Sequence, residues 1–346
     1  MGNKKIELGV AYYGNIFPDN AREDLREMSE HGCNSVLIAM SEYDWRIWRK
    51  NIFRIAQIAK NEFNFNVYIN FWAWGGVFGG EACSFFLHDN TEHRQVISTI
   101  KDGESTDLKV NAACFNDPIF RNYLKTPIKT ISKKQFIDGF FWDEPHYYYT
   151  PKSPDIFTCC CKICQTRFKE LYDKKMPTTL TDEVIKFKEN MITDFLKDIS
   201  SEVKNHDPKK KVIVCLTPPP LDSGIKDWDK LLSSLHGVID VFGSDPYWLL
   251  FGKSLNYVSK YTKITVDLAK KYKLASQLWC LGFLVQRNKE NQLQDAIEIF
   301  DKQGADSIFT WCYRGAEGMS MASANPKKVW KSIGTAYNNL KRKYGL

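Results

Sequence analysis

Short apolar runs alternate with amphipathic segments along almost the whole chain. Eight of these runs have the length and apolar character of strands, and each is followed by a segment whose apolar residues recur at helical spacing. The strands are predicted at residues 8–13, 35–40, 66–74, 136–142, 211–216, 238–242, 274–280 and 307–312. The helices are predicted at residues 21–31, 52–61, 118–132, 162–172, 181–205, 228–236, 254–272, 292–303 and 327–344.

This alternation predicts the fold class. Strands that are apolar throughout, each followed by a crossover helix, are typical of a parallel sheet covered by helices. Eight such units predict a single (β/α)8 TIM barrel over residues 1–346, with a long loop at about 75–113 and a cysteine-rich insertion at about 145–165. A doubly wound open sheet is the alternative, but no Gly-x-Gly-x-x-Gly pattern follows the first strand.

Composition and charge exclude several classes of protein. The 346 residues include 48 Lys and Arg and 41 Asp and Glu, which gives a net charge of +7. The basic residues form no concentrated stripe, so we expect no nucleic-acid partner. No apolar run approaches the roughly 18 residues of a membrane-spanning helix, so we expect no membrane partner. The N-terminal residues lack the apolar core of a signal peptide, which predicts a cytoplasmic protein.

The cysteines suggest a metal site. Of the 10 cysteines, Cys159, Cys161 and Cys164 form a C-x-C-x2-C spacing that can converge on one soft cation. A closed tetrahedral site needs a fourth ligand, for which Cys114 is the candidate. In a chain without a signal peptide, a metal is favoured over disulfides, and inert reduced thiols are the alternative.

Polar and aromatic residues gather where the predicted strands end. Aromatic residues make up 14% of the chain, and the active site of such a barrel lies at the C-terminal ends of its strands. Aromatic faces beside hydroxyl-binding side chains suit a sugar. The candidate substrate-binding residues are Tyr12, Asn70, Trp72, Trp74, Tyr247, Trp248, Gln277, Trp279, Trp311 and Arg314.

Carboxylates stand among these residues. Cleavage of a glycosidic bond uses two carboxyl groups, one protonated and one ionised. Asp143 and Glu144 end the predicted fourth strand, and as neighbours on a strand they are expected to point in different directions. Asp245, which follows the sixth strand, is therefore the candidate second carboxylate across the mouth of the barrel.

The segment Gly139-Phe140-Phe141-Trp142-Asp143-Glu144-Pro145 resembles the fourth-strand motif of clan A glycoside hydrolases, in which Asn-Glu-Pro ends the strand. The resemblance implies that Glu144 is the acid/base. The run Cys159-Cys160-Cys161-Lys162-Ile163-Cys164-Gln165-Thr166-Arg167-Phe168 is similar to the zinc-bearing β-galactosidases of that clan, and Cys114 before Asn116-Asp117-Pro118 matches their further cysteine. This similarity to the zinc-bearing enzymes implies a structural zinc held by Cys114, Cys159, Cys161 and Cys164.

One departure separates the chain from that clan. Its members carry a nucleophilic Glu at the end of strand seven, and here Gln277 stands near the expected place. Their β-galactosidase activity is therefore not carried over. The α-galactosidase type would use Asp143 and Asp245, but its surrounding motifs are absent. Chitinase-like barrels pair a strand-four acid with a substrate amide as nucleophile, but their Asp-x-x-Asp-x-Asp-x-Glu run is also absent.

These observations predict a glycoside hydrolase with Glu144 as general acid/base and Asp143 or Asp245 as its partner. The alternatives are a carbohydrate-binding barrel without hydrolysis, and a carbohydrate lyase or isomerase. The expected partner is a small carbohydrate substrate, with no organic cofactor, and a homo-oligomer is left open.

Overall fold

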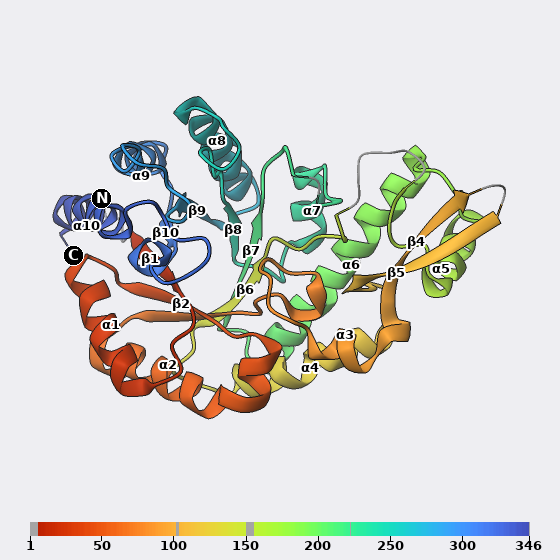
Figure 1. The fold of residues 1–346 in the computed structure, drawn as a ribbon, viewed down its shortest axis with the longest axis horizontal. Coiled ribbons are helices and arrows are strands. Elements are labelled where there is room, and N and C mark those ends of the chain that lie inside the picture. The colour runs from red at the N-terminus through yellow and green to blue at the C-terminus, as the bar shows by residue number, and fades with distance from the viewer. Residues whose placement is uncertain (1–5, 102–103, 150–155, 222, 346) are drawn as a thin grey trace.

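Eight parallel strands close into a barrel in the computed structural model, which describes residues 6–101, 104–149, 156–221 and 223–345 (Figure 1). Around the barrel the strands follow the order β1-β10-β9-β8-β7-β6-β3-β2. Their bounds are β1 (Glu7–Tyr12), β2 (Ser35–Ala39), β3 (Asn66–Asn70), β6 (Gly139–Asp143), β7 (Lys211–Leu216), β8 (Val241–Ser244), β9 (Ala275–Leu281) and β10 (Ser307–Trp311). The predicted (β/α)8 barrel is confirmed.

Helices surround this barrel on the outside (Figure 1). They are α1 (Pro18–Glu30), α2 (Arg49–Phe63), α4 (Pro118–Ser132), α6 (Asp182–His206), α7 (Trp228–Leu235), α8 (Leu255–Lys271), α9 (Gln292–Lys302) and α10 (Pro326–Tyr344). Their starts follow local sequence chemistry. In α4, for example, the side chain of Asp117 accepts the N–H of Ile119, and Pro118 occupies the first helical turn. Among the described residues, no helix combines the length and apolar character needed to cross a membrane.

The barrel interior is filled at its lower and middle levels. The ring of Trp279 packs against Phe141 and Phe309, each with ring centroids 5.0 Å away. At the N-terminal end, Glu7 Oε1 accepts hydrogen bonds from the hydroxyls of Ser35 and Tyr68 at 2.8 and 2.7 Å. These contacts close the bottom of the barrel and leave its C-terminal end for a ligand.

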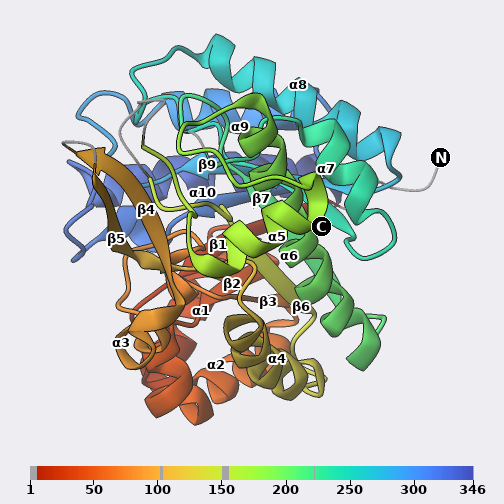
Figure 2. The same cartoon turned by 90° about the vertical axis from the view of Figure 1, so that its right-hand side faces the viewer.

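A lobe beside the barrel is built from the two long insertions. It contains α3 (Phe85–Asp89), the antiparallel pair β4 (Arg94–Lys101) and β5 (Glu104–Ala113), and α5 (Lys162–Tyr172) (Figures 1 and 2). The region predicted as a loop at about 75–113 therefore holds a helix and a hairpin. Gln95 ties the hairpin to the chain after β6, because its side chain accepts the N–H of Tyr148 at 3.1 Å.

Candidate active site

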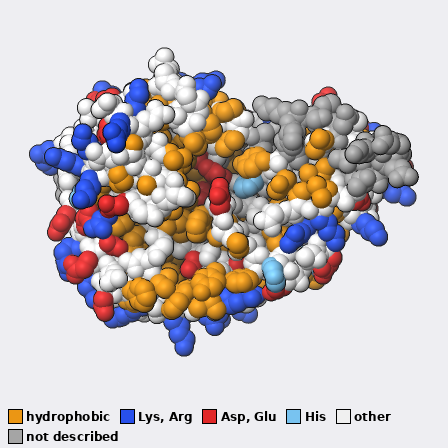
Figure 3. Space-filling model, in the orientation of Figure 1, with side chains coloured by type: hydrophobic (Ala, Val, Ile, Leu, Met, Phe, Trp, Pro, Cys, Tyr) orange, Lys and Arg blue, Asp and Glu red, His pale blue; other side chains and the backbone are white. Residues whose placement is uncertain are grey.

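A cavity of about 630 Å³ opens at the C-terminal ends of β6, β7, β8 and β10. Acidic side chains and a histidine lie side by side near the middle of this face of the molecule, between hydrophobic side chains (Figure 3). The residues that carry polar chemistry into the cavity are Glu81, Asn111, Asp143, Glu144, His146, Thr217 and Tyr247. Its apolar walls include Leu221, Leu250, Phe251, Phe283, Trp311 and Met321.

Asp143 and Glu144 both line this cavity, contrary to the expectation that neighbours on a strand point apart. The reason is that β6 ends at Asp143 and that Glu144 has a φ of 40°, so the alternation of a strand does not extend to it. Gly79 packs against both carboxyl groups. A Cβ at Gly79 would lie 3.0 Å from Asp143 Oδ2 and 3.3 Å from Glu144 Oε2, so this close approach requires glycine.

Asp143 is held by the amide of Asn70, whose Nδ2 donates to Asp143 Oδ2 at 2.9 Å. Asn70 ends β3 and Asp143 ends β6, and these two strands are neighbours in the barrel. Burial raises the pKa of Asp143 well above its ordinary value, and the charge of Glu144 adds to the rise, whereas the Asn70 hydrogen bond lowers that pKa. The predicted residue Asn70 thus contacts the acid cluster directly.

Asp245 lies against Glu144. Burial raises the pKa of Asp245 well above its ordinary value, and the charge of Glu144 and a hydrogen bond to its carboxyl group raise it further. Thr217 donates to Asp245 Oδ2 at 3.3 Å. Within the described chain, the buried Oδ1 of Asp245 has no N–H or hydroxyl donor. Asp245 therefore retains its proton at a pH where an isolated aspartate has lost it.

The three acids differ in their access to the cavity. Asp245 is 1% exposed and Asp143 is 6% exposed, whereas Glu144 is only half-buried. Glu144 is therefore the member of the Glu144–Asp245 pair that a bound molecule reaches, and Asp245 lies beneath it.

His146 fixes the backbone of the acid segment. Its Nδ1 donates to the carbonyl of Glu144 at 2.6 Å, and its ring stacks on Tyr149 with centroids 4.7 Å apart. Burial lowers the pKa of His146, while that hydrogen bond and the charge of Glu144 oppose the shift. A neutral ring that donates one N–H suits a positioning role.

The glycine-rich segment beside the acids is anchored by Glu42. This buried carboxylate follows β2 and accepts the N–H groups of Gly75 and Phe86 at 2.8 and 2.7 Å. It also accepts the hydroxyls of Ser84 and Tyr123 at 2.5 and 3.0 Å. In turn, Gly79 N donates to the carbonyl of Asp143 at 2.8 Å. Glu42 thereby connects the segment after β3 to the acid cluster.

Replacing Glu42 with glutamine is expected to destabilise the protein by about 3 kcal/mol, because a buried carboxylate that accepts hydrogen bonds from two backbone N–H groups and two hydroxyls is replaced by an amide with a single acceptor oxygen. Urea unfolding of the two proteins measures the difference. Glu62→Gln is the control, because Glu62 lies on the surface and pairs with Arg22. An unchanged unfolding midpoint for Glu42→Gln would contradict the anchoring role.

The predicted aromatic residues divide between the cavity and the core. Tyr247 and Trp311 line the cavity, and Trp72 lies edge-on to Tyr13, which in turn contacts Trp311 with centroids 4.3 Å apart. Gly80 has a φ of 110° and packs on the indole of Trp72. By contrast, three of the predicted tryptophans are fully buried and belong to the core: they are Trp74, Trp248 and Trp279.

The remaining predicted residues lie elsewhere. Tyr12 donates to Asp24 at 2.6 Å, and Arg314 pairs with Glu27, in a separate cavity of about 480 Å³ beside β1 and β10. Gln277 is in register with Gly243, below the level of Asp245, and accepts the indole N–H of Trp279 at 2.9 Å. Leu281 ends β9, so no carboxylate stands at the C-terminal end of this seventh barrel strand.

Some cavity residues were not predicted. Gly79 and Glu81 follow β3, and Phe283 follows β9. The run Gly75-Gly76-Val77-Phe78-Gly79-Gly80 was a signal for a close backbone approach, because glycine tolerates positive φ and has no Cβ. The position of an exposed Glu81 has no comparable signal.

The four predicted cysteines come together. The ligand atoms of Cys114, Cys159, Cys161 and Cys164 all lie within 4.8 Å of one another. The sulfur of Cys114 is 3.5 Å from that of Cys164 and 3.6 Å from that of Cys161. Tetrahedral zinc with bonds of about 2.3 Å requires sulfur separations of about 3.8 Å, so this cluster fits a metal ion. Asn116 Nδ2 donates to Cys164 Sγ at 3.3 Å.

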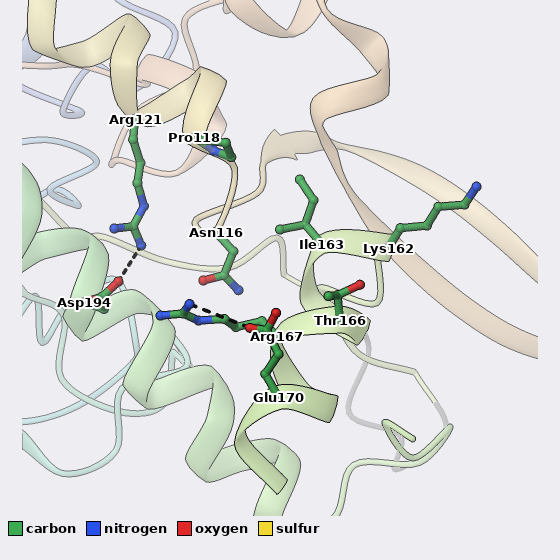
Figure 4. A pocket seen from close by; sticks show the side chains of 9 residues that line it. All are labelled: Asn116, Pro118, Arg121, Lys162, Ile163, Thr166, Arg167, Glu170 and Asp194. Atoms are coloured by element: carbon green, nitrogen blue, oxygen red, sulfur yellow. Dashed lines mark hydrogen bonds and ion pairs between the residues drawn. The ribbon is translucent and has the colours of Figure 1, made fainter. Parts of the chain in front are cut away.

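A second cavity of about 500 Å³ lies beside the cysteine cluster, between α4, α5 and α6 (Figure 4). Four of its five charged side chains are paired, since Arg121 contacts Asp194 at 3.0 Å and Arg167 contacts Glu170 at 3.9 Å. It contains no cluster of buried acids, so we place the candidate active site in the cavity at the barrel mouth.

No protein-family model and no curated protein matches this sequence. Solved structures do resemble it. A catalytic mutant of a GH42 β-galactosidase from G. stearothermophilus has 14% identity and a TM-score of 0.73 over 99% of this chain and 57% of that chain. The β-galactosidase from Halorubrum lacusprofundi has 12% identity and a TM-score of 0.70 over 96% of this chain and 58% of that chain.

A third solved structure is covered by this chain over almost its whole length. The catalytic domain of the β-amylase from Paenibacillus polymyxa has 10% identity and a TM-score of 0.66, over 96% of this chain and 98% of that domain. These likenesses show the fold. The chain spans a little over half the length of the two β-galactosidases, 57% and 58%.

Proposed function

We propose that this chain is a glycoside hydrolase in which Glu144 is the general acid/base and Asp245 is its partner. The observation that carries the proposal is the position of Glu144 in an aromatic-walled cavity, next to Asp143 and near the buried Asp245, whose pKa burial and the charge of Glu144 raise. The likeness of the fold to β-galactosidases and a β-amylase catalytic domain supports this reaction class.

The chemistry follows from the exposure of the two groups. A leaving sugar oxygen needs a proton as its bond to the anomeric carbon breaks. Glu144 is half-buried and lines the cavity, so it can donate that proton, whereas Asp245 is almost completely buried. Asp143 remains the third acid, with Asn70 as its donor. Tyr247 and Trp311 supply aromatic faces for the sugar ring.

A panel of aryl α- and β-glycosides and natural oligosaccharides tests the proposal. We expect release of the aryl alcohol or of a reducing sugar from at least one class. Sugar binding measured by calorimetry, with no cleavage of any compound that binds, would instead favour a carbohydrate-binding barrel. An unsaturated or isomerised product, detected by mass spectrometry and NMR, would indicate a lyase or an isomerase.

We also propose that the four-cysteine cluster holds a structural zinc ion. Four thiolates complete a tetrahedral shell and leave no open position for a substrate. The cluster joins the end of β5 to the chain after β6 and to the first turn of α5, so the ion would fasten the lobe to the segment that carries Glu144. In the proposed site, Asn116 lies beside the sulfur of Cys164.

Protein purified without chelator is expected to contain about one zinc per chain by mass spectrometry of its metals. Cys161→Ser should lose most of that metal and increase proteolysis of the segment after β6 more than it lowers the unfolding temperature. Cys160→Ser is the matched control, because Cys160 lies in the same loop but outside the group of four. Far less than one zinc per wild-type chain would refute the proposal.

A further inference from the structure

Another cavity lies directly beside the candidate active site. It has a volume of about 730 Å³ and runs between the start of α7 and the side of α8 that carries Tyr261 and Ile264. Thr217 and Leu221 line both this cavity and the one that contains Glu144. Because Leu221 is exposed, the two cavities are neighbours at the protein surface, and one extended molecule can occupy both.

We call this second cavity the α7–α8 groove. The residues of the groove that matter for its chemistry are Pro219, Pro220, Leu221, Trp228, Tyr261 and Ile264. They combine apolar and aromatic surface on the outside of the barrel, next to the cavity in which we place the reaction.

The wall between the two cavities is held in place by α8. The hydroxyl of Tyr257 donates to the carbonyls of Pro219 and Pro218 at 2.8 and 3.4 Å. The three consecutive prolines at 218–220 also have few backbone conformations available to them. A groove whose wall is fixed before a ligand arrives loses little conformational entropy on binding.

The opposite wall of the groove is aromatic. Trp228 begins α7 and Tyr261 lies in α8, and the centroids of their rings are 6.2 Å apart with an angle of 49° between the planes. Both side chains are half-buried, so part of each ring faces solvent. Among the described residues, neither the indole N–H of Trp228 nor the hydroxyl of Tyr261 has a hydrogen-bond partner.

Charged side chains of both signs lie at the edge of the groove. Lys226 and Asp227 line it and are exposed. Asp229 also lines it and is held by Lys271 at 2.7 Å. Aromatic faces with polar groups around them suit a neutral sugar, whose C–H face is apolar and whose edge carries hydroxyls. A purely apolar chain would desolvate the polar groups without pairing them.

We propose that the α7–α8 groove binds further sugar units of the substrate, so that the chain acts on oligosaccharides rather than on single glycosides. The proposal rests on the proposed glycosidase function and names its substrate class, a neutral oligosaccharide that extends beyond the cavity of Glu144. Trp228 and Tyr261 bind this extension and touch no reacting atom. Their contribution is therefore made only to substrates long enough to reach the groove.

The test measures kcat/KM on cello-, xylo-, manno-, malto- and β-1,4-galacto-oligosaccharides of two to six units. We expect kcat/KM of the wild type to rise with chain length in the series that is cleaved. Between the shortest cleaved compound and the six-unit compound the rise should be roughly tenfold or more, which corresponds to about 1.4 kcal/mol of added binding free energy.

Two variants remove the aromatic rings one at a time. Trp228→Ala should abolish the rise of kcat/KM with chain length, Tyr261→Ala should reduce it, and Trp228→Phe should restore part of it. The readout is the ratio of kcat/KM between the longest and the shortest cleaved compound within one protein, so a loss of folded protein cancels. Trp228 also packs against Phe242, with centroids 5.5 Å apart, so Tyr261→Ala decides the test if Trp228→Ala does not fold.

Tyr43→Ala is the matched control for these variants. Tyr43 is an aromatic residue that is 49% exposed and lines neither cavity. The Tyr43→Ala variant should keep the wild-type dependence of kcat/KM on chain length.

The outcomes separate this inference from the proposed function. Equal kcat/KM for short and long compounds, or a chain-length dependence that persists in both alanine variants, would overturn the inference and leave the glycosidase proposal standing. If no compound is cleaved, the glycosidase proposal fails, and calorimetry tests the groove alone. Tighter binding of six units than of two by wild type, but not by Trp228→Ala, would support the groove as a sugar site. The absence of both cleavage and binding would overturn both proposals.

Discussion

Glu144→Gln is expected to lower kcat/KM on glycosides with poor leaving groups by roughly 10²- to 10⁴-fold, the range that a general acid contributes. Glutamine keeps the shape of the side chain but has no proton of the required acidity to give to the leaving oxygen. A leaving group such as 2,4-dinitrophenolate departs without a proton. The loss on the dinitrophenyl glycoside should therefore be much smaller than the loss on the alkyl glycoside, and steady-state kinetics on the two substrates measures this difference.

Glu317→Gln is the matched control for this change. Glu317 is an exposed carboxylate in the chain after β10, and it lines the separate cavity beside β1 and β10. The Glu317→Gln variant should retain the wild-type rate on both substrates. A Glu144→Gln variant that loses activity equally on both leaving groups would contradict the acid role, because a loss of folding or binding affects the two alike.

Asp245→Asn is expected to produce opposite changes in activity and stability. Burial and the charge of Glu144 raise the pKa of Asp245 in the folded chain, so the folded state keeps a proton that the unfolded chain loses above about pH 4. The unfolding free energy of the wild type therefore falls as pH rises from about 4 through the raised pKa. Asparagine removes this penalty and can still hydrogen-bond to Glu144 and Thr217.

The Asp245→Asn variant should therefore unfold at a higher denaturant concentration than wild type at pH 8, by at least about 1.4 kcal/mol, the free energy of one pKa unit. The difference should vanish near pH 4. Its kcat/KM should fall by roughly 10²-fold, because the partner acid is lost. A variant less stable than wild type at pH 8 would contradict the raised pKa of Asp245.

The strands and helices of the barrel could be predicted because the spacing of apolar residues in each segment matches the face that the segment buries in the fold. The predicted bounds of the helix at 118–132 match α4 (Pro118–Ser132), and those of the strand at 211–216 match β7 (Lys211–Leu216). The hairpin β4–β5 lies inside the segment that is predicted as a loop, because its strands are rich in polar residues and lack the apolar character of the barrel strands.

The sequence predicts which acids belong to the candidate site but not how their side chains lie relative to one another. The βα rhythm of the sequence implies that Asp143 and Glu144 lie at the end of one barrel strand and that Asp245 follows the next strand but one. That Glu144 lines the same cavity as Asp143 depends on a left-handed backbone at Glu144, which side-chain alternation cannot indicate. Aromatic residues were harder to assign, because Trp74 and Trp279 satisfy their indole N–H groups inside the core and leave the same sequence signal as Trp311 in the cavity.

The measurement that tests the central claim most directly is an NMR time course of a cleavable oligosaccharide or alkyl glycoside with wild type and with Glu144→Gln at equal concentration. The account predicts new anomeric signals of a reducing sugar with wild type and their near absence with the variant, although both proteins bind the substrate. Product formed at the same rate by both proteins would contradict the claim that Glu144 carries a glycosidase reaction.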